Sequence, residues 1–147
     1  MSRFITFEGI EGSGKTTQIQ MLSNHFEERG IDHLLTREPG GTRLGDQIRR
    51  LVLNPANNDM TPTCEMLLYS AARAQHIEQV IRPALADGRV VLCDRFQDAT
   101  MAYQGYGRGL PLDLILRLHS LEVLALRPDL TLLFDLEADV ALERARS

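Results

Sequence analysis

The feature that most constrains the fold of this chain is a glycine-rich segment between a strand-like run and a helix-like run. Residues 9–16 read Gly-Ile-Glu-Gly-Ser-Gly-Lys-Thr, a complete phosphate-loop motif, and they follow the apolar run Phe4–Phe7. Apolar side chains then recur at helical spacing as far as Gly30, which predicts a helix over about residues 15–29. A strand, a glycine-rich loop and a helix in this order predict an α/β fold.

The loop itself predicts a binding site for a nucleoside triphosphate. Glycines let the backbone curl so that several N–H groups point at a phosphate, where side chains would crowd the anion. Lys15 would bridge the β- and γ-phosphates, and the Thr16 hydroxyl would ligate Mg²⁺. The residues expected to hold ATP are Gly9, Ile10, Glu11, Gly12, Ser13, Gly14, Lys15, Thr16 and Thr17.

Composition narrows the class of protein. A chain of 147 residues with 44% hydrophobic and 24% charged residues fits one globular domain over residues 1–147. A net charge of -4 argues against a nucleic-acid-binding surface. Cys64 and Cys93 lack a redox or zinc spacing, and we find no signal peptide and no apolar run long enough to span a membrane. We therefore expect a cytoplasmic protein without nucleic-acid or membrane partners.

The rest of the chain reads as alternating strands and helices. Strands are expected over residues 33–36, 90–94 and 130–135, and the last two are continuous apolar runs that should be buried. Helices are expected over about 44–52, 61–86, 112–119 and 138–146, with a flexible loop over 105–109. This order predicts a doubly wound parallel sheet. Its carboxyl edge, where ligands bind, would carry Asp94 and a loop that exposes the cation of Arg37 and the carboxylate of Glu38.

Together with the phosphate loop, five further segments make the chain resemble the bacterial thymidylate kinases. They are Thr-Arg-Glu-Pro-Gly-Gly-Thr (36–42), Leu-Leu-Tyr-Ser-Ala-Ala-Arg (67–73), Asp-Arg-Phe (94–96), Ala-Tyr-Gln-Gly-Tyr-Gly-Arg-Gly (102–109) and Arg-Pro-Asp-Leu-Thr (127–131). The resemblance implies a three-layer P-loop kinase fold, in which helices flank a parallel sheet. It also implies phosphoryl transfer from ATP, with Mg²⁺, to dTMP, giving dTDP and ADP for dTTP synthesis.

The resemblance assigns phosphate and sugar contacts to individual residues. Glu11 would accept a hydrogen bond from the sugar 3'-hydroxyl. Arg37 and Arg95 would hold the dTMP phosphate, because a guanidinium fork suits a phosphate dianion. Asp94 would help place the phosphates bound to magnesium. The implied catalytic residues are Lys15, Arg37, Asp94 and Arg95, and the implied metal ligands are Thr16 and Asp94.

Other residues match the part of the family's site that holds the base. Tyr69 would stack on thymine, and Arg73, one helical turn on, would reach the base. Thr100, Tyr103 and Gln104 match the stretch that lines the base and the 2'-position of the sugar. The alternative interpretation is that Tyr69 is a core residue.

The match to the family is incomplete near the lid. Family members carry a catalytic arginine in the phosphate loop or in the lid, and residues 11–13 contain none. Arg144 and Arg146 could begin a lid, and a fifth strand and final helices would follow, so we expect a C-terminally incomplete domain. The alternatives are another small-molecule P-loop kinase, a non-catalytic nucleotide-binding fragment and a nucleotide-hydrolysing switch. A homodimer through the long helix from about residue 63 is a further hypothesis, although its apolar face could be core.

Overall fold

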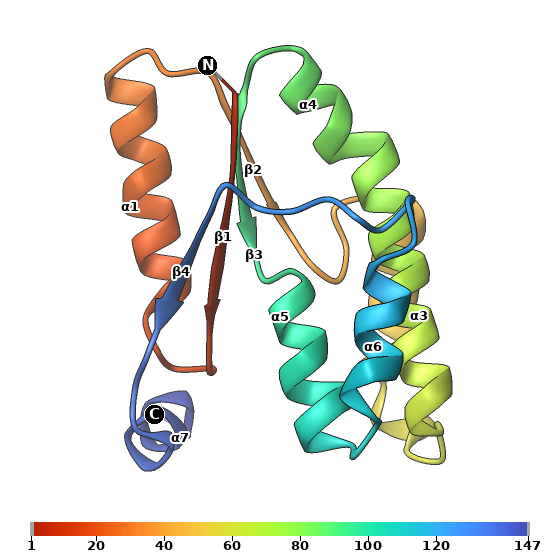
Figure 1. The fold of residues 1–147 in the computed structure, drawn as a ribbon. Coiled ribbons are helices and arrows are strands. Elements are labelled where there is room, and N and C mark those ends of the chain that lie inside the picture. The colour runs from red at the N-terminus through yellow and green to blue at the C-terminus, as the bar shows by residue number, and fades with distance from the viewer. Residues whose placement is uncertain (1, 147) are drawn as a thin grey trace.

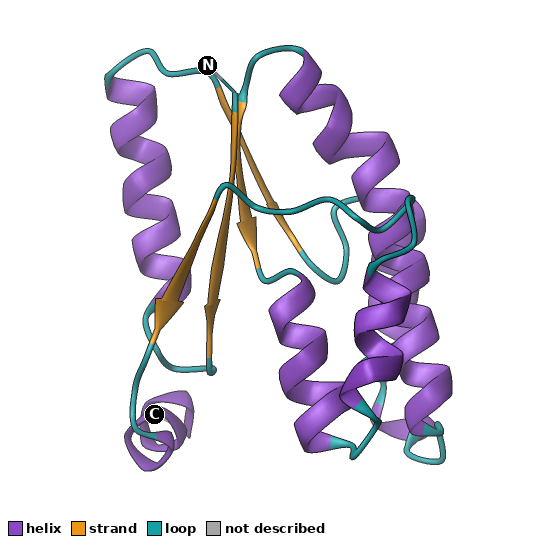
Figure 2. Cartoon of the chain, viewed as in Figure 1, coloured by secondary structure: helices purple, strands orange, loops and turns teal. Residues whose placement is uncertain are grey.

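A parallel sheet lies between helices in the computed structural model, which describes residues 2–146 without the side chains of residues 142, 145 and 146 (Figures 1 and 2). The strands are β1 (Arg3–Gly9), β2 (His33–Arg37), β3 (Val90–Asp94) and β4 (Leu130–Phe134). They pair in the order β2-β3-β1-β4, and every pairing is parallel. The expected strands and the parallel sheet are therefore confirmed.

Helices cover both faces of this sheet. They are α1 (Lys15–Glu28), α2 (Arg43–Val52), α3 (Pro62–His76), α4 (Arg82–Ala86), α5 (Gln97–Thr100), α6 (Leu112–His119) and α7 (Ala138–Arg146). Helix α1 lies on one side of the sheet, and α3 to α6 lie on the other (Figure 1). A short 3₁₀ turn follows α2 at Pro55–Asn57. The arrangement has the three layers that the resemblance implied.

The two faces of the sheet bury separate apolar clusters. On the α1 side, Phe7 and Leu92 pack with Ile19 of the helix. On the opposite side, Val91 packs in a cluster with Ile77, at the end of α3. Because β3 is covered on both faces, its residues 90–93 are apolar without alternation, whereas β1 also buries the polar Thr6 and Glu8. The carboxyl ends of β1 and β3 position the site described below.

The prediction that the last strand is buried is wrong. Four of the five residues of β4 are exposed, and Leu133 is 70% exposed. The strand lies at the edge of the sheet and pairs only with β1 within residues 2–146. An apolar run predicts a strand, but it does not reveal whether another element covers that strand.

The prediction of a flexible loop over residues 105–109 is also wrong for its first part. A π-helical stretch, Met101–Gly107, extends α5 through this segment. Gly105 is buried, and a Cβ there would lie 2.6 Å from Leu112 Cδ2. The glycine therefore allows the close packing of α6 against this stretch, and it does not mark a turn.

The long helix predicted to residue 86 is confirmed in an interrupted form. A π-helical stretch, Ile77–Ile81, joins α3 to α4, and Pro83 lies in the first turn of α4. Proline cannot donate the usual backbone hydrogen bond and its ring crowds the preceding turn, so a wider turn before it accommodates the ring.

Candidate active site

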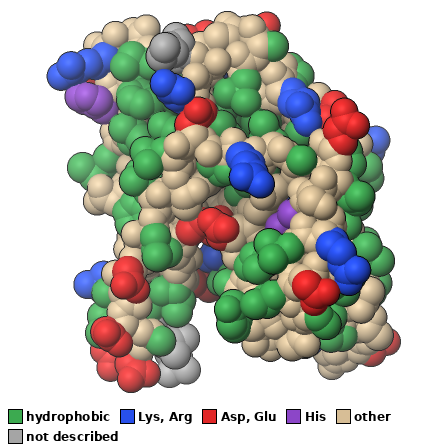
Figure 3. All heavy atoms as spheres, viewed as in Figure 1, with side chains coloured by type: hydrophobic (Ala, Val, Ile, Leu, Met, Phe, Trp, Pro, Cys, Tyr) green, Lys and Arg blue, Asp and Glu red, His purple; other side chains and the backbone are tan. Residues whose placement is uncertain are grey.

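A cavity of about 1010 Å³ opens at the carboxyl edge of the sheet. Figure 3 shows the surface hollowed between α7 and the ends of α5 and α6, with charged side chains beside the hollow. The predicted site residues that line it are Glu11, Gly12, Ser13, Gly14, Lys15, Thr16, Thr17, Tyr69, Arg73, Asp94, Arg95, Thr100, Tyr103 and Gln104. One cavity therefore brings together segments that lie far apart in the sequence.

Backbone geometry shapes the phosphate-loop end of the cavity. Gly12 and Gly14 have φ angles of 79° and 84°, in the left-handed region that favours glycine. A Cβ on Gly12 would collide with Ala141 O. Helix α1 begins immediately after Gly14, which supplies no side-chain cap. The first N–H groups of α1 are therefore available to an anion.

Lys15 and Asp94 face each other across this end. Lys15 is 6% exposed, and its Nζ lies 3.9 Å from Asp94 Oδ1, a separation too long for a hydrogen bond. Burial lowers the pKa of Lys15, and the charge of Arg95 lowers it further. Among the described residues, Asp94 Oδ1 and Ser13 Oγ are buried side-chain oxygens without a hydrogen-bond partner. Buried oxygens are normally paired, so these two are available to a ligand.

Arg95 follows β3 in a strained backbone conformation. Its φ of 69° is the only positive value at a non-glycine residue within residues 2–146. Its N–H donates to Phe7 O (2.9 Å), and its carbonyl accepts from Cys93 Sγ (3.1 Å). The next N–H, of Phe96, donates to Glu8 Oε1 (2.7 Å). Burial raises the pKa of Glu8 to about 7. Such strain persists only where surrounding contacts enforce it, and it is common at functional sites.

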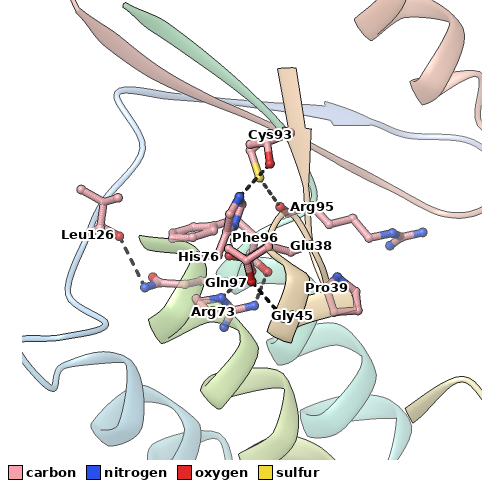
Figure 4. A network of polar contacts seen from close by, with 12 residues as sticks. Glu38, Pro39, Gly45, Arg73, His76, Cys93, Arg95, Phe96, Gln97 and Leu126 are labelled. Atoms are coloured by element: carbon pink, nitrogen blue, oxygen red, sulfur yellow. Dashed lines mark hydrogen bonds and ion pairs between the residues drawn. The ribbon is translucent and has the colours of Figure 1, made fainter. Parts of the chain in front are cut away.

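Arg73 lies at the opposite end of the cavity within a buried polar network (Figure 4). Its Nε donates to Glu38 Oε2 (2.6 Å). Its Nη2 donates to Phe96 O and to Thr100 Oγ1 (3.0 Å each), and its Nη1 lies 3.3 Å from His119 Nε2. The prediction that Glu38 is exposed is therefore wrong: the residue is 6% exposed because it is paired with Arg73.

The remaining predicted base contacts surround this network. Tyr69 is half-buried on α3, and burial raises its pKa. The Arg95 guanidinium lies 5.2 Å from the ring centre of Tyr103, within range of a cation–π contact. Gln104 donates to Glu65 Oε1 (2.7 Å). Thr100, predicted to line the base, is 2% exposed, and its hydroxyl is engaged by Arg73.

Arg37 is not among the residues that line the cavity, although Asp94, its register partner in the sheet, is. Its exposed side chain approaches Asp46, with Nη2 3.5 Å from Oδ1. Gly9 and Ile10 are likewise outside the described lining. The proposed contact of Arg37 with the dTMP phosphate thus stays a prediction.

Sequence reasoning assigned no site role to several charged residues that line the cavity. Arg49 donates to Pro39 O (3.1 Å), and Arg108 donates to Met60 O (2.6 Å). Each of these cations resembles an ordinary helix-surface or loop residue in sequence, so only their placement reveals them. Arg144 lines the cavity from α7, whereas the side chain of Arg146 lies outside the described residues.

The described residues contain neither a cluster of metal-ligating side chains nor a membrane-spanning helix. No group of three or more His, Cys, Asp and Glu side chains within them could hold a metal ion. None of the helices within residues 2–146 combines the length and the apolar character needed to cross a membrane.

Comparison with known proteins identifies the family. The family model for thymidylate kinase matches residues 7–147. The thymidylate kinase of Geotalea daltonii is 61% identical over 145 residues, which are 99% of this chain and 68% of that protein. That of Syntrophotalea carbinolica is 56% identical over 147 residues, which are 100% of this chain and 68% of the relative.

A solved structure agrees with these relatives. The crystal structure of thymidylate kinase from Ehrlichia chaffeensis matches with a TM-score of 0.86 and 42% sequence identity, covering 99% of this chain and 82% of that one. The resemblance drawn from the sequence segments is therefore confirmed along the length of the chain. This chain belongs to the thymidylate kinase family.

Proposed function

We propose that this chain is a thymidylate kinase that transfers the γ-phosphoryl group of ATP to dTMP, giving dTDP and ADP for dTTP synthesis. One observation carries the proposal. A single cavity joins the phosphate loop to a second cation, Arg95, and beyond it to the buried Arg73. A hydrolase needs only the first part, whereas a kinase of nucleoside monophosphates needs a site for a second phosphate and a base.

The donor end would bind ATP through the loop backbone and Lys15. Curled backbone N–H groups and the start of α1 favour the phosphates, and Lys15 would offset charge that spreads over the transferred group. Mg²⁺ would be held by Thr16 and Asp94 together with the phosphates, a ligand set in keeping with its preference for few protein oxygens. Asp94 Oδ1, which has no hydrogen-bond partner within the described residues, supports this fit. The ion would neutralise negative charge on the phosphates.

The acceptor end would bind dTMP between the loop and α3. Arg95 would hold its phosphate, and Glu11 would accept from the 3'-hydroxyl. Tyr69 and Arg73 would contact the thymine ring. A phosphate oxygen of dTMP then attacks the γ-phosphorus, and the bond from that phosphorus to the bridging oxygen of ADP breaks. A phosphate oxyanion needs no general base, so positioning and charge stabilisation suffice.

The test is ADP formation with ATP, magnesium and each of four acceptor conditions: dTMP, dUMP, AMP and none. ADP release that requires dTMP, with dTDP formed in equal amount, supports the proposal. Lys15→Ala controls for contaminating kinases. ADP release without an acceptor would indicate a hydrolase. Binding of dTMP without transfer would indicate a nucleotide-binding module.

Three further features belong to this proposal. Residues 1–147 would act as part of one P-loop kinase domain. Two copies would pair through the helix that begins near residue 63, whose Leu67 is 52% exposed. Light scattering that gives the mass of a single chain would contradict the dimer. The cytoplasmic setting stays a prediction, supported by the free thiols of Cys64 and Cys93.

A further inference from the structure

Glu38 is a buried carboxylate at the base end of the cavity to which the proposed function gives no role. Its side chain is 5% exposed, and its two oxygens have different partners on α3. Oε2 accepts from Arg73 Nε (2.6 Å), and Oε1 lies 3.1 Å from His76 Nδ1 (Figure 4). Arg73 and His76 are three residues apart and so lie on the same face of α3. One carboxylate therefore bridges consecutive turns of the helix.

Glu38 and His76 contact the sheet as well as each other. The backbone N–H of Glu38 donates to Asp94 O (2.9 Å) at the end of β3. His76 Nε2 lies 2.7 Å from Thr36 Oγ1 on β2. Close packing also limits movement here, because a Cβ on Gly41 would lie 2.6 Å from His76 Nε2. Glu38 thus has a fixed position relative to the strand ends.

The contacts of Arg73 leave one of its nitrogens, Nη1, with an N–H that can donate to a ligand. Nε is used by Glu38, and both hydrogens of Nη2 have acceptors, Phe96 O and Thr100 Oγ1. Nη1 lies 3.3 Å from His119 Nε2. Burial, together with the charge of Arg73, lowers the pKa of His119 to about 4, so its ring is neutral and can accept. Nη1 carries two hydrogens, and the second has no acceptor within the described residues.

Burial makes this arrangement depend on the carboxylate. The Arg73 side chain is 3% exposed, so its charge has little contact with water. A buried cation without its counter-ion costs several kcal/mol, and the side chain would move or recruit water to avoid that cost. Without Glu38, the guanidinium would lose the acceptor of its Nε–H and the carboxylate that balances its charge.

We propose that Glu38 is a positioning residue that sets base specificity, because it orients Arg73 so that Nη1 presents one N–H to the base end of the cavity. A single fixed donor pairs with a ring carbonyl and is mismatched to an exocyclic amino group, which is itself a donor. The inference rests on the proposed function, since it takes a pyrimidine nucleotide as the acceptor. It predicts that a change at Glu38 alters the choice of base more than it alters the KM for ATP.

The test compares Glu38→Gln with Glu78→Gln, which removes a carboxylate from the exposed pair with Arg82. Glutamine has nearly the same shape, but its amide group offers a donor where the carboxylate offers an acceptor. We expect the KM for dTMP to rise about tenfold and the preference for dTMP over dCMP in kcat/KM to fall about tenfold. The KM for ATP should change less than about twofold. Glu78→Gln should match the unsubstituted chain in every constant.

A second substitution keeps the inference testable if Glu38→Gln does not fold. Thr100→Val removes another acceptor of Arg73 without removing a charge. It should raise the KM for dTMP and lower the preference for dTMP over dCMP. Where both single variants fold, the effect of Thr100→Val in the double variant should not add to that of Glu38→Gln. A folded Glu38→Gln with unchanged KM and base preference would overturn the inference alone. An unsubstituted chain that neither binds nor phosphorylates dTMP would overturn the proposed function itself.

Discussion

The two ends of the cavity are built in different ways. At the phosphate end, one continuous segment, residues 11–17, lines the cavity, and its glycines and backbone N–H groups form the proposed phosphate-binding surface. The base end comes from side chains of the β2–α2 loop, α3, α5 and α6, held together by hydrogen bonds among buried groups. The first end depends on backbone shape, and the second depends on side-chain pairing. The two should therefore fail in different ways when residues are changed.

The largest expected effect is at the phosphate end. Lys15→Ala should lower kcat about 10³-fold, because the charge that spreads in the transition state loses a buried cation. The affinity for dTMP should stay within about threefold, since Lys15 belongs to the donor half of the cavity. ADP release gives kcat, and calorimetric titration gives the affinity. An equal loss in kcat and in the affinity for dTMP would show that the two ends of the cavity do not act independently.

At the base end, the main expected loss is in folding stability. Arg73→Ala leaves the Glu38 carboxylate buried without its cation, so the free energy of unfolding should fall by about 4 kcal/mol. Urea denaturation measures this value. The matched control is Arg82→Ala, which breaks an exposed pair with Glu78 and should cost under about 0.5 kcal/mol. Similar costs for the two variants would mean that the buried network contributes nothing beyond an exposed pair.

Between the two ends, Glu8 should make stability depend on pH. Its pKa is raised from 4.5 to about 7 in the fold, so between these values the folded chain binds more protons than the unfolded chain. Stability from this group is present at low pH and is lost as pH rises towards 7, by up to about 3 kcal/mol. Glu8→Gln should remove that decline. Urea denaturation across this range, in both proteins, measures the difference, and parallel curves would contradict the assignment.

The smallest expected effect tests the backbone argument for the phosphate loop. Gly12 and Gly30 both have left-handed φ angles, of 79° and 64°. Gly30→Ala should cost about 1 kcal/mol of stability, because a Cβ there meets no atom within 4 Å. Gly12→Ala should cost about 2 kcal/mol and weaken ATP binding, because the same Cβ collides with Ala141 O. Thermal unfolding and ATP titration compare them, and equal behaviour would remove any special role for the loop.

Much of the phosphate end could be predicted from sequence because its rules are local. Glycine spacing, a preceding apolar strand and a following helix occupy adjacent residues, so the loop and α1 were predicted within a residue or so. The order of strands and helices followed from the same periodicity. The roles of individual residues at this end stay predictions, although Asp94 and Arg95 do line the cavity.

The wrong predictions concern which residues are buried and which side chains pair. Both depend on residues distant in the sequence. Glu38 was expected to be exposed because its neighbours are loop formers, and its partner Arg73 lies 35 residues later. Leu133 was expected to be buried because its strand is apolar, yet no element within residues 2–146 covers it and it is exposed. Gly105 was interpreted as part of a loop, although it serves helix packing. Local patterns do not carry this information.

The end of β1 has a geometric consequence for bringing two phosphates together. Phe7 and Glu8 hold the backbone around Arg95, and Gly9, the next residue of the same strand, begins the phosphate loop. A strand advances about 3.3 Å per residue, so Phe7 and Gly9, the supports of the two proposed phosphate sites, lie about 7 Å apart on one strand. If the proposed sites are correct, the backbone of β1 fixes the separation between the donor and acceptor phosphates. Loop movements can close over the substrates without changing it.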